Sequence, residues 1–445
     1  MTVATRVVAD RGTVLDEIAA ESAVRERAGQ DPAEQVELLR SAGLTALTLD
    51  TEHGGGGADP VELLDFVIDL ARADPITAHI LRAHFWFVEQ IRRLPDGPVR
   101  QRWSAEIAAG KIFGNASSER TGTAGSFELS SRLTPVGDGW VLTGEKFYST
   151  GTAFSDYVAA QAIIDDGTGR VARVIVPVDR PGVTVVDDWD GIGQHRTGTG
   201  STTFTDVAVS DDEILAILDP SSELPIANDA PLLQLFLQAL ITGILFSVAD
   251  DAATLLRSRT RSFAHAPDPS PRHDPILLAT VGEIDAAAHV ARAALAAGAD
   301  IEAATLAARR GEIDPELFDR AAVAAARVKV HVDRVALPAA SSLFEAGGGV
   351  VGEPGPQPGP ALAQHPHHHP AQPDIVQGGG RRGPAGQRQP AAAQRLLLSA
   401  AHRSPPTPTN PCGGEPSPHG RRWRGLACTR DVSSTTSAAR SDHHR

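Results

Sequence analysis

The chain has 445 residues and a formal net charge of −14, so it is long enough for several domains and a large buried core. This acidic balance argues against nucleic acid as the main partner, because phosphate binding needs a surplus of Lys and Arg. Both cysteines, Cys412 and Cys428, lie near the C-terminal end. The rest of the chain therefore has no disulfide and no cysteine metal site, as is typical of a reducing cytoplasm. Residues 1–20 contain no apolar run, and we expect no signal peptide.

Residues 1–110 are expected to form an N-terminal α-helical domain. Asp31-Pro32 and Asp74-Pro75 each place a capping side chain before a proline that favours the first helical turn. The second pair precedes residues 76–94, whose apolar side chains recur at helical spacing. The glycine run HGGGGAD at 53–59 lacks the lysine of a phosphate loop, and we expect a mobile surface loop there.

Residues 111–215 change to short runs rich in β-branched residues between Gly and Pro turns, which predicts a central β domain of about seven or eight strands. Residues 225–349 return to Ala- and Leu-rich segments, which predict a C-terminal helical bundle. The apolar stretch from Pro231 is about as long as a membrane span. Gln234 and Gln238 interrupt it, so we expect a helix buried in the bundle. Helices, strands and helices in this order indicate an α+β fold.

The composition changes near residue 350. Residues 351–445 carry a net charge of +6, whereas residues 1–350 carry −20. Proline and glycine are frequent there, and we expect residues 350–445 to be disordered. The sequence HPHHH from His365 could suggest a metal site, but its surroundings cannot build a packed one, and we expect no metal.

Several motifs together resemble those of the acyl-CoA dehydrogenases. They are FGNASSERTG at 113–122, GEKFYSTG at 144–151, HGGGGAD at 53–59 and LFEAGGG at 343–349. The run DDWDGIGQHRTGTGST at 187–202 is most similar to the flavin-dependent monooxygenases of the dibenzothiophene monooxygenase type. The resemblance covers about residues 15–349. It implies an acyl-CoA dehydrogenase-like fold with an N-terminal helical domain, a central β domain and a C-terminal helical bundle.

The resemblance also implies an activity. Such flavoprotein oxidoreductases use reduced FMN from a separate flavin reductase, together with O2, to form a C4a-(hydro)peroxyflavin. The implied substrate is a small sulfur-containing or aromatic compound, and the implied protein is a cytoplasmic homotetramer. One alternative is an FAD-dependent acyl-CoA dehydrogenase, which needs a carboxylate base. Another is a non-catalytic remnant of such an enzyme.

The catalytic residues implied by the resemblance are His84, Asn115 and Thr150. His84 matches a family histidine on the helix that faces the pocket, where it could donate to the substrate or the peroxide. Its neighbours Phe85, Trp86 and Phe87 could wall an aromatic substrate. A structural role is the alternative for each of these side chains, because a lone histidine on an apolar helix is usually part of the core.

The flavin contacts implied by the resemblance form a larger set. Tyr148 and Thr150 are two residues apart, so we expect them on one face of a strand. Trp189 could stack on the flavin ring or wall it, and Arg261 resembles an arginine that meets the flavin phosphate. The full set comprises Asn115, Ser117, Ser118, Tyr148, Thr150, Trp189 and Arg261.

The family pattern stops after about residue 349. Dropping one base from the degenerate codons of residues 355–399 permits the residues that the family has there. We therefore hypothesise a one-base frameshift near codons 348–351, either a sequencing error or a real lesion. In the shifted frame the histidine cluster becomes codons for residues such as isoleucine and threonine. At the position where many dehydrogenases carry their catalytic glutamate, the codon in the shifted frame can encode Asn or Ser but never Glu. A catalytic base donated from another helix remains an alternative.

Overall fold

The computed structural model describes residues 10–120, 129–191, 193–219, 230–312 and 314–347, all in the first of the chain's two units, Met1–Arg403. The expected disordered tail, its histidine cluster and the hypothesised frameshift lie outside the described residues. Within them the order of elements is helices, then strands, then helices.

The N-terminal part is helical, as predicted. Its elements are α1 (Arg11–Ala28), α2 (Ala33–Ser41), η1 (Leu44–Ala46), η2 (Thr51–His53), α3 (Pro60–Ala73), α4 (Pro75–Ile80), α5 (Arg82–Arg92) and α6 (Pro98–Ala108). Asp74 caps α4 as predicted, because its carboxylate accepts from the N–H groups of Ile76 and Thr77 at 2.9 and 3.2 Å. The cap predicted at Asp31 is wrong by one residue. Pro32 takes that position, and the Asp31 carboxylate pairs with Arg196 instead.

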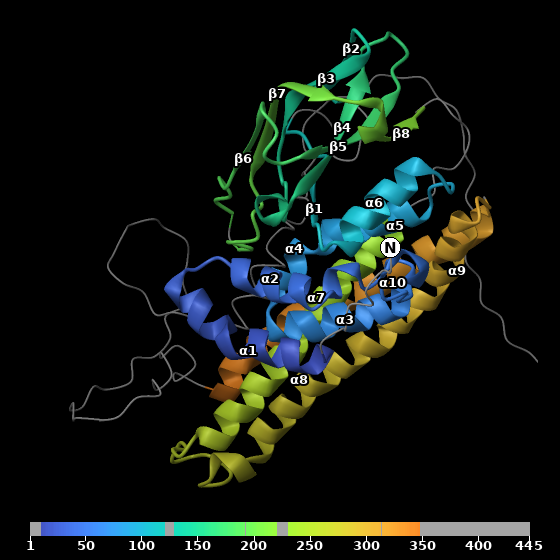
Figure 1. Cartoon of the computed structure of the whole chain (residues 1–445). Helices are drawn as coiled ribbons and strands as arrows, with labels where there is room; N and C mark the ends of the chain where they lie inside the picture. The colour runs from blue at the N-terminus through green and yellow to red at the C-terminus, as the bar shows by residue number, and fades with distance from the viewer. Residues whose placement is uncertain (1–9, 121–128, 192, 220–229, 313, 348–445) are drawn as a thin grey trace, which may run out of the picture. The chain divides into compact units, whose positions relative to one another are not determined.

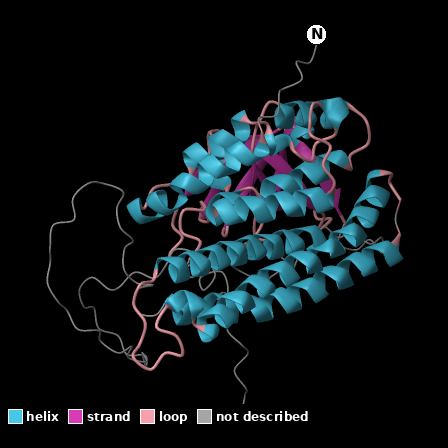
Figure 2. Cartoon of the chain, turned by 90° about the horizontal axis from the view of Figure 1, so that it is seen from below, coloured by secondary structure: helices cyan, strands magenta, loops and turns pink. Residues whose placement is uncertain are grey.

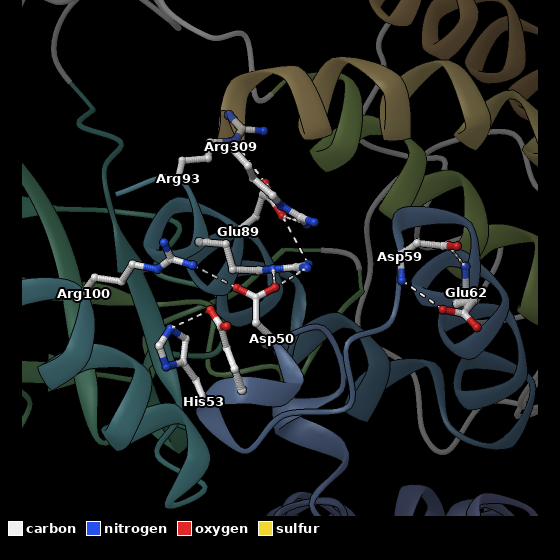
Figure 3. A network of polar contacts seen from close by, with 10 residues as sticks. Asp50, His53, Asp59, Glu62, Glu89, Arg93, Arg100 and Arg309 are labelled. Carbon is white, nitrogen blue, oxygen red and sulfur yellow. Dashed lines mark hydrogen bonds and ion pairs between the residues drawn. The ribbon is translucent and has the colours of Figure 1, made fainter. Parts of the chain in front are cut away.

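The glycine run forms a packed turn where we expected a mobile loop. The N–H groups of Gly55, Gly56 and Gly57 donate to backbone carbonyls of residues 46–50 at 2.8–3.1 Å. A Cβ at Gly55 would lie 2.1 Å from the Leu49 carbonyl oxygen, so this close approach requires glycine. Asp59 follows the turn and begins α3 (Figure 3).

One eight-stranded sheet follows, in the order β6-β7-β3-β2-β4-β5-β8, with β1 paired parallel to β4. The strands are β1 (Phe113–Ala116), β2 (Arg132–Val136), β3 (Gly139–Lys146), β4 (Tyr157–Ile164), β5 (Val171–Pro177), β6 (Val183–Val186), β7 (Ser201–Val209) and β8 (Ile214–Leu218). Figure 1 shows these strands gathered apart from the long helices. β5 is an almost continuous apolar run because both of its faces are buried.

Four helices complete the described chain. They are α7 (Ala230–Ser258), α8 (Pro275–Ala294), α9 (Gly298–Arg309) and α10 (Pro315–Gly347). α7 packs against α3, α8 and α10. Figure 2 shows that long helices of the chain run side by side. Among the described residues α7 is the one helix long and apolar enough to span a membrane, yet 72% of its apolar window is buried. The prediction of a buried bundle helix from Pro231 is confirmed.

An aromatic stack joins the helices to the sheet. The ring of Phe87 on α5 stacks on Phe113 of β1 at 4.1 Å, and Phe113 stacks on Tyr157 of β4 at 5.1 Å. Phe87 and Phe85 are therefore buried in the core, so of the three aromatic residues that follow His84 only Trp86 is partly exposed. The stack fixes β1, and with it Asn115, against α5.

An ion network ties the end of α5 to α9 (Figure 3). Asp50 accepts from Arg92 at 2.9 Å and from Arg100 at 3.2 Å. Glu89 accepts from the Nε of Arg309 at 3.1 Å. The contact between Glu89 and Arg309 joins α5 to α9, so it links the N-terminal helical part of the chain to the C-terminal one.

Candidate functional site

The motif segments of the β domain meet at one end of the sheet. The Asn115 N–H donates to the Thr152 hydroxyl at 3.1 Å, and this hydroxyl donates back to the Asn115 carbonyl at 3.1 Å. The Gly151 N–H donates to the Thr197 carbonyl at 2.9 Å. β1, the turn after β3 and the 187–200 segment are therefore joined through their backbones.

Helix α4 closes directly onto this junction. Gly151 has φ +83°, and a Cβ there would lie 2.4 Å from the Ile80 carbonyl oxygen. A residue with a side chain would be strained in this conformation and would push α4 away. The glycine therefore brings α4 next to Thr150.

A chain of neutral polar groups runs from the sheet to α4. The Thr150 hydroxyl lies 2.7 Å from that of Thr199, which lies 2.7 Å from that of Thr197. The Thr197 hydroxyl donates to the Gln194 backbone carbonyl at 2.7 Å. The side-chain oxygen of Gln194 lies 2.6 Å from Nδ1 of His79.

The Gln194 backbone carbonyl at one end of this chain determines which hydroxyl donates in each hydrogen bond. A carbonyl can only accept, so the single proton of the Thr197 hydroxyl points at Gln194. Thr199 must then donate to Thr197, and Thr150 must donate to Thr199. Thr150 is left with its oxygen lone pairs, and it can therefore act only as an acceptor toward a bound molecule.

Tyr148 and Trp189 form an aromatic pair beside Thr150. Their ring centroids are 5.8 Å apart in an edge-to-face arrangement, and Trp189 donates to the Gly193 carbonyl at 2.6 Å. The expectation that Tyr148 and Thr150 share a strand face is wrong. β3 ends at Lys146, and Tyr148 has φ 59°, so the alternation of the strand no longer applies. Tyr148 is instead 53% exposed.

The predicted residues of the β1 motif have separate environments. The Ser117 hydroxyl donates to the side-chain oxygen of Asn115 at 2.7 Å, so the amide group of Asn115 keeps its two N–H donors. Ser118 is exposed, and its carbonyl accepts from the Phe147 N–H at 2.8 Å. Ser118 thus ties the two motifs together through its backbone.

The same two motifs hold a buried ion pair that the sequence reasoning did not single out. Nζ of Lys146 lies 2.7 Å from Oε1 of Glu119, and the side chains are 0% and 3% exposed. Burial alone would raise the pKa of the Glu119 carboxyl, but hydrogen bonds from Lys146, Ser130 and Ser131 outweigh it and lower that pKa to about 2. The sequence signal for this pair was a glutamate in one motif and a lysine in the other, which carry opposite charges.

His84 and Arg261 lie apart from these groups. Nε2 of His84 donates to the Thr45 carbonyl at 2.7 Å, and Nδ1 accepts from the Phe113 N–H at 3.3 Å. Burial lowers the pKa of His84 to about 4. Both ring nitrogens therefore serve backbone groups in this conformation. Arg261 is exposed beyond the end of α7, and within the described ranges it makes no hydrogen bond to the predicted flavin residues.

His79 is the histidine that faces the junction, and the sequence reasoning missed it. It precedes His84 by five residues, and only the turn residue Leu81 separates α4, which holds His79, from α5, which holds His84. Helical spacing alone could not show which of the two histidines lies nearer to the site. The deciding contact, with Gln194, joins residues far apart in the sequence.

The junction fits a flavin ring. Tyr148 offers an exposed aromatic surface next to Trp189, and Asn115 and Thr150 supply a donor and an acceptor. The fully buried Ser149 hydroxyl has no hydrogen-bond partner among the described residues. Within the same ranges no group of three or more His, Cys, Asp or Glu could hold a metal ion.

Comparison with known proteins first defines the class. Residues 9–111 match the acyl-CoA dehydrogenase N-terminal domain. The structure aligns with FMN-bound TdsC from Paenibacillus sp. A11-2 with a TM-score of 0.70 and 28% sequence identity, covering 76% of this chain and 86% of that one. The chain therefore has the acyl-CoA dehydrogenase-like fold, and the predicted fold class is confirmed.

Relatives found by sequence then indicate which enzymes of this fold the chain resembles. A dibenzothiophene monooxygenase from Rhodococcus qingshengii is 29% identical over 343 residues, which span 75% of this chain and 81% of that protein. A probable FMNH2-dependent monooxygenase, SfnC, from Pseudomonas putida is 29% identical over 264 residues, or 58% of this chain and 64% of that protein. The predicted resemblance to flavin-dependent monooxygenases of this fold is thus confirmed.

Proposed function

We propose that the chain is a two-component monooxygenase that uses reduced FMN and O2 on a small sulfur-containing or aromatic substrate. The hydrogen-bonded chain from Thr150 to Gln194, whose side chain contacts His79, carries this proposal. It leaves Thr150 as an acceptor beside the exposed Tyr148 and the half-buried Trp189. The similarity to FMN-bound TdsC and to an FMNH2-dependent monooxygenase supports the choice of flavin.

Bound reduced FMN supplies two electrons that let O2 transfer one oxygen atom to the substrate and leave the other as water. We propose that the Thr150 oxygen accepts from an N–H of the reduced flavin ring, because its own proton is committed to Thr199. The amide N–H groups of Asn115 would hold an oxygen atom of the flavin ring. Tyr148 and Trp189 would cover the ring and exclude water.

The roles of the two histidines follow from their partners. We propose that His79 holds Gln194 in place, because its Nδ1 lies 2.6 Å from the side-chain oxygen of that residue. His84 would be a structural tie between α5, the η1 turn and β1. Ser117 would orient Asn115. For Ser118 and Arg261 the predicted flavin contacts remain proposals that rest on the resemblance alone.

The alternative, an acyl-CoA dehydrogenase, needs a carboxylate that can take a proton near neutral pH. Among the described residues at the junction, Glu119 is paired with Lys146, and its pKa is about 2. Asp188 accepts from the hydroxyl and N–H of Ser201, which lower the pKa of that carboxyl. Neither group is poised to act as such a base.

A rapid-mixing experiment tests the proposal. Protein loaded anaerobically with reduced FMN is mixed with O2, and the return of oxidised-flavin absorbance is followed. We expect this return to be much slower than for free reduced FMN, with a small sulfur-containing or aromatic compound yielding an oxygenated product. Thr150→Val should shorten the delay, and Thr150→Ser should largely keep it. Reoxidation at the rate of free flavin, with bleaching of bound FAD by an acyl-CoA, would support the dehydrogenase.

We further propose a cytoplasmic homotetramer served by a separate flavin reductase. Gel filtration with light scattering tests the tetramer, and aggregated protein without flavin would favour the non-catalytic remnant. The frameshift hypothesis is tested by the gene's nucleotides, because codons 348–399 must spell the family's residues in the shifted frame.

A further inference from the structure

We infer that Arg82 binds the anionic group of the substrate, which would make the substrate a small organic anion such as a sulfinate, sulfonate or carboxylate. This inference rests on the proposed function and adds a substrate class to it. It concerns a residue that no motif of the sequence singled out.

Arg82 lies at the junction of α4 and α5, shortly after His79. α4 ends at Ile80 and α5 begins at Arg82, and Leu81 between them has the backbone angles of a tight turn (φ −81°, ψ −2°). Arg82 thus follows His79 within three residues, with a single residue between the two helices. It is therefore close in the chain to the histidine that meets the site and to Ile80, whose carbonyl abuts Gly151.

The partner of Arg82 is a backbone carbonyl. Its Nε donates to the Leu233 carbonyl of α7 at 3.3 Å, which places the side chain between α5 and α7. A guanidinium has five N–H donors, and within the described ranges this is the hydrogen bond that Arg82 makes. The contact anchors the stem of the guanidinium and leaves the fork of two terminal nitrogens for another acceptor.

Other buried arginines of the same helical part have carboxylate partners. Arg25 pairs with Asp74, and Arg92 pairs with Asp50 at 2.7 Å. Arg82 has no ion pair with a described residue, although it is partly buried and burial lowers the pKa of its guanidinium to about 10. A desolvated guanidinium that no described carboxylate neutralises favours an anionic ligand. A planar carboxylate or a sulfinate matches the guanidinium fork.

Two bound anions have the required chemistry, the substrate and the phosphate of FMN. The position favours the substrate, because Arg82 follows closely after His79, whose ring contacts Gln194 at the site. A flavin phosphate lies at the far end of the ribityl chain from the reacting ring, whereas an oxidised substrate atom must lie beside the ring.

Calorimetry on the full FMN-loaded chain tests the inference without turnover. The probes are methanesulfinate, benzenesulfinate and benzoate, with methyl phenyl sulfoxide as the neutral counterpart of benzenesulfinate. We expect at least one anion to bind the wild type, and Arg82→Gln to weaken that binding by about 10- to 100-fold. Arg82→Lys should lose less, and affinity for the sulfoxide should stay within about twofold.

Arg72→Gln is the matched control, because Arg72 forms a solvent-exposed pair with Asp250. It should bind every probe as the wild type does. Thermal unfolding of each variant shows whether a loss of binding reflects a loss of fold, and Arg82→Lys keeps the test open if Arg82→Gln is unstable. Equal sulfinate affinity of Arg82→Gln and the wild type overturns the inference, as does a wild type that binds none of the anions.

Flavin titrations separate the two anions. If Arg82→Gln weakens FMN but not riboflavin, and leaves anion affinity unchanged, Arg82 holds the flavin phosphate and the inference is wrong. Failure of the proposed function would look different. Arg82-dependent anion binding would persist while reduced FMN and O2 gave no oxygenated product.

Discussion

Two polar clusters lie within a few residues of each other at the end of β3, and they differ in charge. Lys146 and Glu119 form a buried ion pair that ties the β1 and β3 motifs together. Thr150 begins a neutral chain that reaches His79 on α4. The charged pair serves the structure, because removing either partner leaves an uncompensated buried charge. The neutral chain fixes the direction of its hydroxyl protons and leaves Thr150 as an acceptor, which suits a site that binds an N–H donor.

The largest expected effect comes from breaking the charged cluster. Lys146→Met should lower the free energy of unfolding by about 3–5 kcal/mol, because Glu119 would stay buried without its counter-ion. Urea unfolding followed by circular dichroism measures this. Glu145→Gln, at the exposed neighbouring position, should change it by less than about 0.5 kcal/mol. A loss below about 1 kcal/mol for Lys146→Met would show that the pair is not what holds the motifs.

The second effect tests the buried, neutral state of His84 through the pH dependence of stability. Burial lowers the pKa of folded His84 to about 4, below the value of about 6.5 expected when the chain is unfolded. Between these values the unfolded state binds more protons, so stability should rise with pH from about 4 to 6.5, by on the order of 3 kcal/mol. Urea unfolding between about pH 4 and pH 7 measures it. His84→Gln should flatten the curve, and an unchanged slope would refute the role of a neutral, buried tie.

A smaller effect concerns the contact between α4 and the neutral cluster. Gly151→Ala should cost about 1–3 kcal/mol of stability, from the left-handed backbone and the clash with the Ile80 carbonyl. Gly137→Ala is the control, because Gly137 has φ +59° and nothing lies within 4 Å of the place that a Cβ would take. It should show only the backbone strain of about 1 kcal/mol. Equal losses would mean that α4 does not rest on Gly151.

The smallest effect is expected inside the neutral chain. Thr199→Val removes the link between Thr150 and Thr197 and should cost about 0.5–1.5 kcal/mol. Thr199→Ser keeps the hydroxyl and should cost less. Chemical denaturation measures both variants, and the flavin reoxidation assay then reports whether Thr150 has lost its orientation. A loss as large as that of Lys146→Met would erase the distinction between the two clusters.

Local signals predicted the fold well. The Asp74-Pro75 cap, the buried helix from Pro231 and the change from helices to strands near residue 111 each follow from short-range patterns. Errors arose where tertiary contacts decide the outcome. Asp31 leaves its expected cap to pair with Arg196, and the glycine run packs on residues 46–50 where we expected a loose loop.

The candidate site was predicted only in part, for the same reason. Asn115, Thr150, Tyr148 and Trp189 lie in or beside recognisable motifs, and the structure brings them to one end of the sheet. His79 carries no local signal that distinguishes it from His84. Only its contact with Gln194, whose position depends on the whole sheet, sets it apart. Arg82 likewise stands out only in the structure, because no described carboxylate pairs with it.

The approach of Ile80 to Gly151 joins the helical part of the chain to its sheet at the place where we propose that flavin binds. A ligand that contacts both sides binds only the docked arrangement, so its concentration adds to the stability of that arrangement. At 100 times the dissociation constant this contribution is about 2.7 kcal/mol. In protein made while flavin is scarce, α4 would separate more often from the Gly151 turn, and proteases would cleave the protein sooner. The supply of the vitamin-derived cofactor would thus regulate how much of the protein a cell retains.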